Sequence, residues 1–151
     1  MKKDCIFCKI ARKEIPSVQI YEDADFLGIL DINPNTIGMT LIITKKHYPS
    51  YAFDIPESVY NKIMSITKKI AKMIDKNLGV KRTAMVMEGM GINHLHIKLY
   101  PLYGLKEKFT ETWHPQKIFF KEYEGYITTQ LGPQAKKEEL EKIAKKIRSG
   151  K

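Results

Sequence analysis

The sequence predicts an α+β domain with an antiparallel sheet of about five strands, one long helix and a C-terminal extension that ends in a helix. Three observations support this fold class. Short apolar runs rich in β-branched residues occur before residue 45 and again after residue 82. The segment between them has apolar residues at spacings of three and four, which is typical of a helix. The chain of 151 residues has no internal repeat or low-complexity linker, so its length predicts one domain.

The expected strands follow from short runs bounded by turn residues. Two apolar runs flank a polar turn at residues 22–25 and predict a β-hairpin. A third run lies between Gly38 and the pair Lys45 and Lys46, and two more follow the long helix. The runs are VQIYED (18–23), DFLGILDIN (25–33), MTLIIT (39–44), TAMVME (83–88) and NHLHIKLYP (93–101).

The long helix is expected from Glu57 to Gly79. Asp54 with Glu57 three residues later resembles a capping box, and Gly79 is a typical C-terminal stop. A last helix is expected after Gly132 and Pro133. The apolar stripes of the two helices are Val59, Ile63, Ile66, Ile70, Met73, Ile74 and Leu78, and Leu140, Ile143, Ala144 and Ile147.

Charge and hydropathy indicate the kinds of partner. The net charge of +9 favours polyanions, which include nucleotides, nucleic acid and acidic membranes, although most lysines fit solvated helix faces. The first ten residues lack the apolar stretch of a secretory signal, and no segment approaches 18 consecutive apolar residues. We therefore expect a soluble, cytoplasmic protein with no membrane partner.

Four residues have the chemistry of a metal site: Cys5, Cys8, His47 and His94. A C-x-x-C turn can bring two thiolates to one ion, and zinc prefers four nitrogen or sulfur donors in a tetrahedron. Two other interpretations stay open from spacing alone. The cysteines could be a redox pair, although no strand precedes Cys5 as in thioredoxin-like motifs, or they could be buried and unligated.

The segment NHLHIKLYP places polar and apolar residues on opposite faces of a strand. His94, His96, Lys98 and Tyr100 share one face because successive side chains of a strand alternate. Leu95, Ile97 and Leu99 share the other face, which can pack on the long helix. On this pattern alone, a half-exposed polar face without a catalytic role is an equally good interpretation.

Several motifs in order resemble the histidine triad (HIT) superfamily, whose members carry His-φ-His-φ-His-φ-φ on a strand. The resemblance covers residues 4–101 and rests on CIFCKI with a following IP, LDINP, GMTLIITKKH and HLHIKLYP. It implies a HIT-like core at 1–101, with residues 102–151 as an extension packed on the same domain. It also implies a homodimer that binds a purine nucleotide and transfers or hydrolyses at the α-phosphate.

The resemblance assigns a role to individual positions. His96 matches the nucleophile, while His94 and His47 match the residues that join the two cysteines in zinc-containing relatives, where the zinc is structural. Asp31 matches the acidic residue that binds the ribose hydroxyls, and Leu30 and Ile32 would line the base pocket. Gly91 and Asn93 are the residues left to contact the phosphate.

The chain departs from the family pattern at two places. Lys98 stands where the third histidine is expected, and a lysine there can contact a phosphate oxygen and lower the pKa of His96. The loop before the histidine strand is short, with Met87 near the position of a phosphate-binding asparagine and Gly89 available for an anion-binding nest. His114 could enter the site from the extension, or it could be a surface histidine.

Three functions are therefore considered. The first is a nucleotide hydrolase or transferase that acts through a nucleotidyl-histidine on a phosphoramidate, a dinucleoside polyphosphate or an adenylated small molecule. The second is a nucleotide-binding or regulatory module that has lost turnover, as Lys98 and the short loop suggest. The third is a nucleic-acid-processing protein that uses the basic extension, which ranks last because no nucleic-acid-binding motif is recognised.

Overall fold

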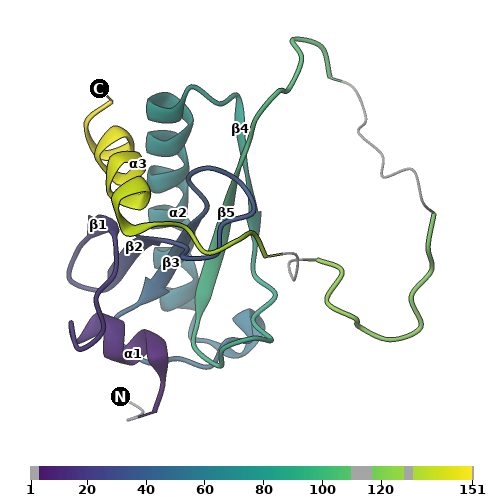
Figure 1. The fold of residues 1–151 in the computed structure, drawn as a ribbon. Coiled ribbons are helices and arrows are strands. Elements are labelled where there is room, and N and C mark those ends of the chain that lie inside the picture. Colours follow the sequence, from purple (N-terminus) through teal and green to yellow (C-terminus); the bar gives the residue numbers. More distant parts are fainter. Residues whose placement is uncertain (1–3, 110–116, 128–130, 151) are drawn as a thin grey trace.

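The computed structural model describes residues 4–109, 117–127 and 131–150. Its centre is an antiparallel sheet with the strand order β1-β2-β3-β5-β4 (Figure 1). The strands are β1 (Gln19–Glu22), β2 (Phe26–Leu30), β3 (Thr40–Thr44), β4 (Arg82–Val86) and β5 (His96–Leu102). The α+β fold with a five-stranded antiparallel sheet, expected from the apolar runs, is confirmed.

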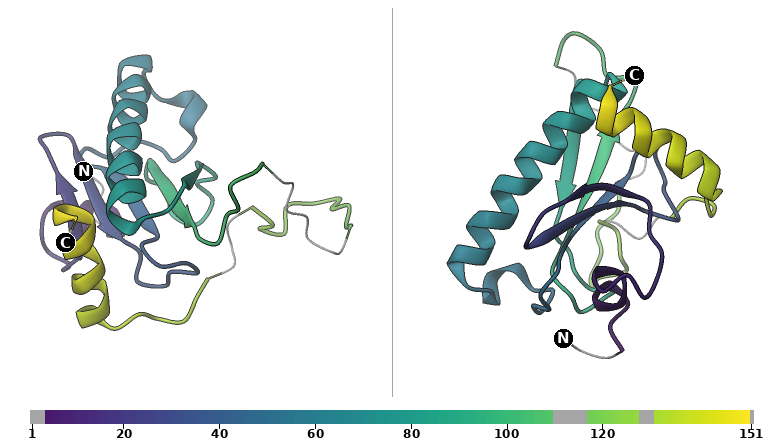
Figure 2. Two further views of the ribbon diagram at one scale, coloured as in Figure 1. Left: turned by 90° about the horizontal axis from the view of Figure 1, so that it is seen from above. Right: turned by 90° about the vertical axis from the view of Figure 1, so that its left-hand side faces the viewer.

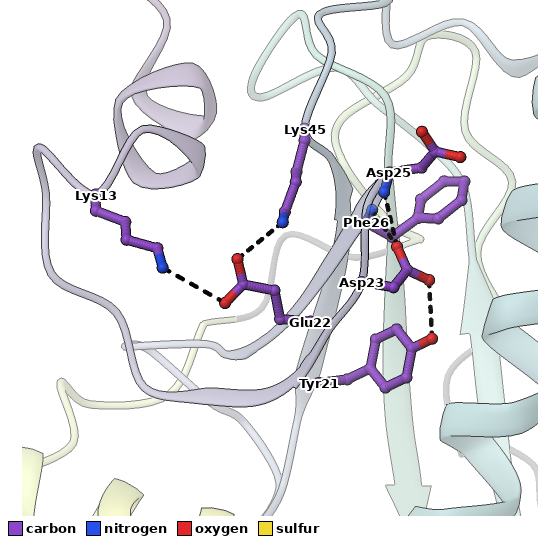
Figure 3. Close-up of polar contacts among 7 residues, drawn as sticks. All are labelled: Lys13, Tyr21, Glu22, Asp23, Asp25, Phe26 and Lys45. Atoms are coloured by element: carbon purple, nitrogen blue, oxygen red, sulfur yellow. Dashed lines mark hydrogen bonds and ion pairs between the residues drawn. The ribbon is translucent and has the colours of Figure 1, made fainter.

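The hairpin between β1 and β2 is closed by polar contacts around Asp23 (Figure 3). The Asp23 carboxylate accepts hydrogen bonds from the backbone N–H groups of Asp25 and Phe26 and from the Tyr21 hydroxyl. Beside the turn, the Glu22 carboxylate lies 2.8 Å from the ammonium of Lys45, which follows β3. These contacts tie the hairpin together and link it to the next strand.

The long helix α2 (Glu57–Leu78) ends as expected but begins differently. Gly79 caps it in the left-handed conformation, with φ of 69°. The expected capping box is wrong, because Asp54 belongs to a separate 3-10 turn, η1 (Ala52–Asp54), and Pro56 is the N-cap residue. Proline has a fixed φ that suits the start of a helix, so Pro56 determines where α2 begins.

One face of the sheet packs against α2 and the C-terminal helix α3 (Lys137–Ser149), which lie side by side (Figure 2). Leu95, Ile97 and Leu99 of the histidine segment are in this core, as the alternation predicted. Gly38 allows the close packing, because its φ is +81° and a Cβ there would lie 2.4 Å from Leu78. The remaining contributors from the two helices include Ile63, Ile70, Ile74, Leu140, Ala144 and Ile147.

The opposite face of the sheet is partly covered by a short helix, α1 (Ile6–Ala11), near the N-terminus (Figure 1). This helix was not expected from the sequence. Its residues Phe7 and Ile10 pack on side chains of β2 and β3, among them Leu27 and Leu41. Helices therefore lie on both faces, which explains why every residue of β2 and β3 is buried.

The histidine strand continues further than expected at one end and starts later at the other. Pro101 pairs with Thr83 inside the sheet, and β5 ends at Leu102. His94 lies before the strand, although it was expected to begin it. No helix among the described residues is long and apolar enough to cross a membrane.

Candidate functional site

A cavity of about 690 Å³ opens on the face of the sheet that carries α1. Its apolar lining includes Phe7 and Ile10 of α1 with Ile15, Leu30 and Ile32. The cavity is also lined by His96 and Lys98 from β5 and by Gly91 from the preceding loop. An apolar wall beside a few polar groups is the usual form of a small-molecule site.

His96 is held in one tautomer by the backbone. It is 5% exposed, and its Nδ1 lies 2.7 Å from the carbonyl oxygen of His94. A carbonyl only accepts hydrogen bonds, so Nδ1 carries the proton and donates it. The lone pair is then on Nε2, for which no hydrogen-bond partner is found among the described residues. The edge of the Phe7 ring supports the imidazole, with ring centroids 5.2 Å apart.

The surroundings of His96 favour the neutral imidazole. Burial lowers the pKa of His96 most strongly, and the ammonium of Lys98 lowers it further. The hydrogen bond to the His94 carbonyl and the charges of Glu88 and Asp31 act in the opposite direction and are outweighed. The effect expected from Lys98 is therefore present, but burial is the larger cause.

Lys98 reaches the same cavity from the middle of the sheet. It pairs with Leu41 on one side and Val86 on the other, and its side chain is partly buried. Lys98 and His96 are two residues apart on β5, so they project from the same face. The cavity thus contains one imidazole and one ammonium on a rigid strand.

Four of the five residues expected to contact a nucleotide line the cavity, and the fifth does not. Leu30, Asp31, Ile32 and Gly91 all line the cavity. The backbone N–H of Asn33 donates to Oδ1 of Asp31 at 2.8 Å, which fixes that carboxylate. Asn93 does not line the cavity, and its side-chain oxygen accepts a hydrogen bond from the backbone N–H of Ser50 at 3.0 Å.

Two further positions from the sequence analysis lie elsewhere. Met87 packs against the core on the α2 side of the sheet. His114 lies outside the described residues.

Cys5, Cys8, His47 and His94 form one cluster. Their ligand atoms all lie within 4.8 Å of one another. Cys5 is the N-cap residue of α1 and Cys8 lies in its first turn, so the helix sets their spacing. His47 follows β3 and His94 precedes β5, which brings two loops to the same end of the sheet. This arrangement can hold a metal ion.

The distances fit tetrahedral zinc. Zinc with Zn–S near ~2.3 Å and Zn–N near ~2.05 Å sets nitrogen–nitrogen separations of roughly 3.3 Å and nitrogen–sulfur separations of roughly 3.5 Å. The two Nδ1 atoms are 3.2 Å apart, and the sulfur atoms of Cys5 and Cys8 lie 3.3 and 3.6 Å from Nδ1 of His94. The sulfur of Cys8 is 3.5 Å from Nδ1 of His47.

His94 is prepared as a ligand. Its Nε2 lies 2.8 Å from the carbonyl oxygen of Thr44, so Nε2 donates a hydrogen bond and Nδ1 keeps its lone pair for the metal. Burial lowers the pKa of His94 to about 4, which keeps the ring neutral. The donor set, the distances and this hydrogen bond are consistent with zinc.

Part of the cavity lining was not expected from the sequence. Phe7 and Ile10 were not expected there, because a helix of six residues is too short for its apolar residues to show a helical period. Glu88 and Glu124 also line the cavity, and both are in segments without regular structure. The helical spacing of Phe7 and Ile10, three residues apart, is the only signal that could have indicated them.

Comparison with known proteins agrees with this geometry. The HIT domain family model matches residues 12–104, which is more than half of the chain. The chain belongs to the histidine triad family, so the resemblance noted from its motifs is confirmed.

Two curated relatives and one solved structure show the range of similarity. An adenosine 5′-monophosphoramidase of Saccharomyces cerevisiae is 33% identical over 122 residues, covering 77% of this chain and 73% of its own. An adenylylsulfatase of Arabidopsis thaliana is 38% identical over 106 residues, covering 67% of this chain and 53% of its own. A HIT-like protein of Bartonella henselae, described as involved in cell-cycle regulation, has a TM-score of 0.73 at 27% identity, covering 100% and 98% of the chains.

Proposed function

We propose that this protein is a nucleotide hydrolase or transferase that acts at the α-phosphate of a purine nucleotide derivative through a covalent intermediate on His96. The position of the neutral Nε2 of His96 at a cavity of nucleotide size carries the proposal. Relatives named as a monophosphoramidase and an adenylylsulfatase support nucleotide hydrolysis in general.

The nucleoside would occupy the apolar part of the cavity. Leu30, Ile32 and Phe7 offer apolar surfaces that suit a purine base. Asp31 lies at the edge of this region with one oxygen fixed by the Asn33 N–H, so its carboxylate can accept hydrogen bonds from the ribose hydroxyls. This placement directs the phosphate toward His96, Lys98 and Gly91.

The chemistry then proceeds in two displacements. Nε2 of His96 attacks phosphorus, and the bond to the leaving group breaks as the nitrogen–phosphorus bond forms. The leaving group departs with that electron pair and takes a proton from water. A water molecule then attacks phosphorus and loses a proton to solvent, which releases the monophosphate and returns the electron pair to Nε2. Lys98 stabilises negative charge on the phosphate oxygens throughout.

Zinc in the four-residue cluster would have a structural role. The ion would be fully coordinated by Cys5, Cys8, His47 and His94, and a closed site leaves no position for substrate. It would connect α1 to the loops that precede β5 and follow β3. We also infer a homodimer in the cytoplasm from the resemblance, which light scattering and cell fractionation can test.

The proposal is tested by mixing the protein with adenosine 5′-phosphoramidate and measuring release of adenosine monophosphate. Wild-type protein is expected to release it, and His96→Ala is expected to be at least a thousandfold slower. Equal rates for both proteins would remove His96 from the mechanism. Tight purine nucleotide binding by calorimetry without product over hours would instead favour the binding module that has lost turnover.

A further inference from the structure

The loop between β4 and β5 contacts the loop that follows β3 at several points. The backbone N–H of Leu95 donates to the carbonyl oxygen of Tyr48 at 2.9 Å, which joins the two loops beside β5. The β4–β5 loop supplies Met90 and Gly91 to the cavity lining, whereas residues 45–51 of the other loop supply nothing to it. The loop after β3 can therefore affect the cavity only through its contacts with the β4–β5 loop.

The side chain of Asn93 makes one of these contacts. Its Oδ1 accepts a hydrogen bond from the backbone N–H of Ser50 at 3.0 Å, and the Ser50 hydroxyl lies 3.4 Å from the same oxygen. Asn93 is exposed and does not line the cavity. Its amide therefore bridges two loops that are 43 residues apart in the sequence, and it does not face the space where a ligand would lie.

Gly89 makes a second contact with the same residue. Its φ is +74°, and a Cβ at this position would lie 2.9 Å from the carbonyl oxygen of Ser50. Only glycine allows so close an approach in this conformation. Ser50 thus touches the β4–β5 loop at Gly89 and at Asn93, and the residues that line the cavity, Met90 and Gly91, lie between these two points.

The segment held in this way has donors to offer. Among the described residues, no hydrogen-bond acceptor is found for the backbone N–H groups of Met90 and Gly91. Successive backbone N–H groups can bind an anion when the chain holds them in one direction. A segment that is already fixed also loses less conformational entropy when the ligand binds.

Resting on the proposed function, we propose that Asn93 is a positioning residue that holds residues 89–92 against Ser50 and so directs the N–H groups of Met90 and Gly91 toward the α-phosphate. Asn93 directly precedes His94, and Ser50 follows His47 by three residues. The Asn93–Ser50 contact therefore lies beside the four-residue cluster without belonging to it. Asn93 acts on the phosphate only through the backbone that it holds.

Calorimetry with adenosine and adenosine 5′-monophosphate separates this role from a general effect on the fold. The two ligands differ only in the phosphate, so the ratio of their Kd values measures what the phosphate contributes. Asn93→Ala is expected to weaken binding of the monophosphate about tenfold and to leave the Kd of adenosine within twofold of wild type. The kcat/KM for adenosine phosphoramidate should fall by a similar factor.

Two further variants test the geometry. Asn93→Asp keeps an oxygen that can accept the Ser50 N–H, so it should restore the monophosphate Kd to within about threefold of wild type. Gly89→Ala places a Cβ against the Ser50 carbonyl and should weaken monophosphate binding at least as much as Asn93→Ala. The matched control is Asn61→Ala, which removes an exposed amide from α2 and should change neither Kd.

Thermal unfolding and metal content of each variant check that the fold and the neighbouring cluster are retained. An unchanged Kd ratio in Asn93→Ala would overturn the positioning role and leave the proposed function standing. Weakening of adenosine and the monophosphate by the same factor would also overturn it. If the expected ratios are found but no compound is hydrolysed, the positioning role stands and the proposed function fails. Wild-type protein that binds neither ligand would overturn both.

Discussion

The backbone carbonyl of His94 accepts a hydrogen bond from Nδ1 of His96 at 2.7 Å, so a residue of the metal cluster orients the proposed nucleophile. His94 has two tasks: its Nδ1 faces the cysteines, and its carbonyl fixes the tautomer of His96. Any change that moves the His94 backbone will also move Nε2 of His96. The four-residue cluster and the cavity are therefore connected through the backbone of His94.

This link predicts that loss of metal affects both stability and activity. Purified protein is expected to contain one zinc per chain by metal analysis. Cys8→Ser, which changes a fully buried ligand, should lose zinc and lower the free energy of unfolding by about 3 kcal/mol or more. It should also lower kcat/KM, because His96 is misaligned and α1, which carries Phe7 and Ile10 of the cavity lining, is no longer held by the metal. Zinc-free wild-type protein in which Cys5 is freely alkylated would contradict the site.

Lys98 is predicted to support the reaction by its charge. Lys98→Met keeps an unbranched side chain, one atom shorter, and removes the ammonium, so kcat/KM for adenosine phosphoramidate should fall about tenfold to a hundredfold. Lys98→Arg should keep part of the activity, since the charge remains but the shape differs. Thermal unfolding of both variants serves as the folding control. A Lys98→Met protein within twofold of wild type would show that the charge is not used.

Asp31 is predicted to recognise the ribose. Asp31→Asn can still accept the hydrogen bond from the Asn33 N–H, so the loop should keep its conformation. The variant loses the carboxylate that we expect to bind the hydroxyls. Wild-type protein should prefer the adenosine compound over its 2′-deoxy counterpart by about tenfold in kcat/KM, and Asp31→Asn should lose most of this preference. Equal discrimination by both proteins would place the ribose elsewhere.

The hairpin at Asp23 gives a prediction about pH and stability. Burial acts to raise the pKa of Asp23, but the hydrogen bonds from Tyr21, Asp25 and Phe26 outweigh it and lower the pKa below the ordinary value of 3.8. A group with a lowered folded-state pKa stabilises the fold above its unfolded-state pKa, and this stabilisation is lost as the pH falls through the folded-state value. Asp23→Ala should therefore cost about 1 kcal/mol near pH 7 and progressively less below pH ~4.

Asp25→Ala is the matched control for the hairpin. Its exposed carboxylate makes an ion pair with Lys62 at 3.1 Å, and exposed pairs contribute little to stability. Urea unfolding of both variants between pH 3 and pH 7 should separate them. The prediction is contradicted if Asp23→Ala and Asp25→Ala show the same small loss at every pH.

Much of the sheet and the long helix could be predicted because their residues repeat with a clear period. The strand at 40–44 follows from a short run rich in β-branched residues, the alternation around His96 follows a spacing of two, and α2 follows a spacing of three and four. The metal cluster could be anticipated because only four histidines and two cysteines offer such ligands. The zinc it would hold, and the roles assigned to the cavity residues, stay predictions.

What could not be predicted depends on contacts between distant segments. The six residues of α1 are too few to show a helical period, so the packing of Phe7 near His96 was not visible in the sequence. Pro56 determines the start of α2, where local capping residues suggested Asp54. Glu88 and Glu124 lie in irregular segments, and only the folded chain brings them to one cavity.

The central claim is that Nε2 of His96 forms a covalent bond to phosphorus. The most direct measurement is mass spectrometry of protein quenched within milliseconds of mixing with adenosine phosphoramidate. We predict an added adenylyl group on the peptide that contains His96, formed and lost at rates consistent with turnover, and absent from His96→Ala. Turnover without any adenylylated peptide, or an adenylyl group on another residue, would contradict the account.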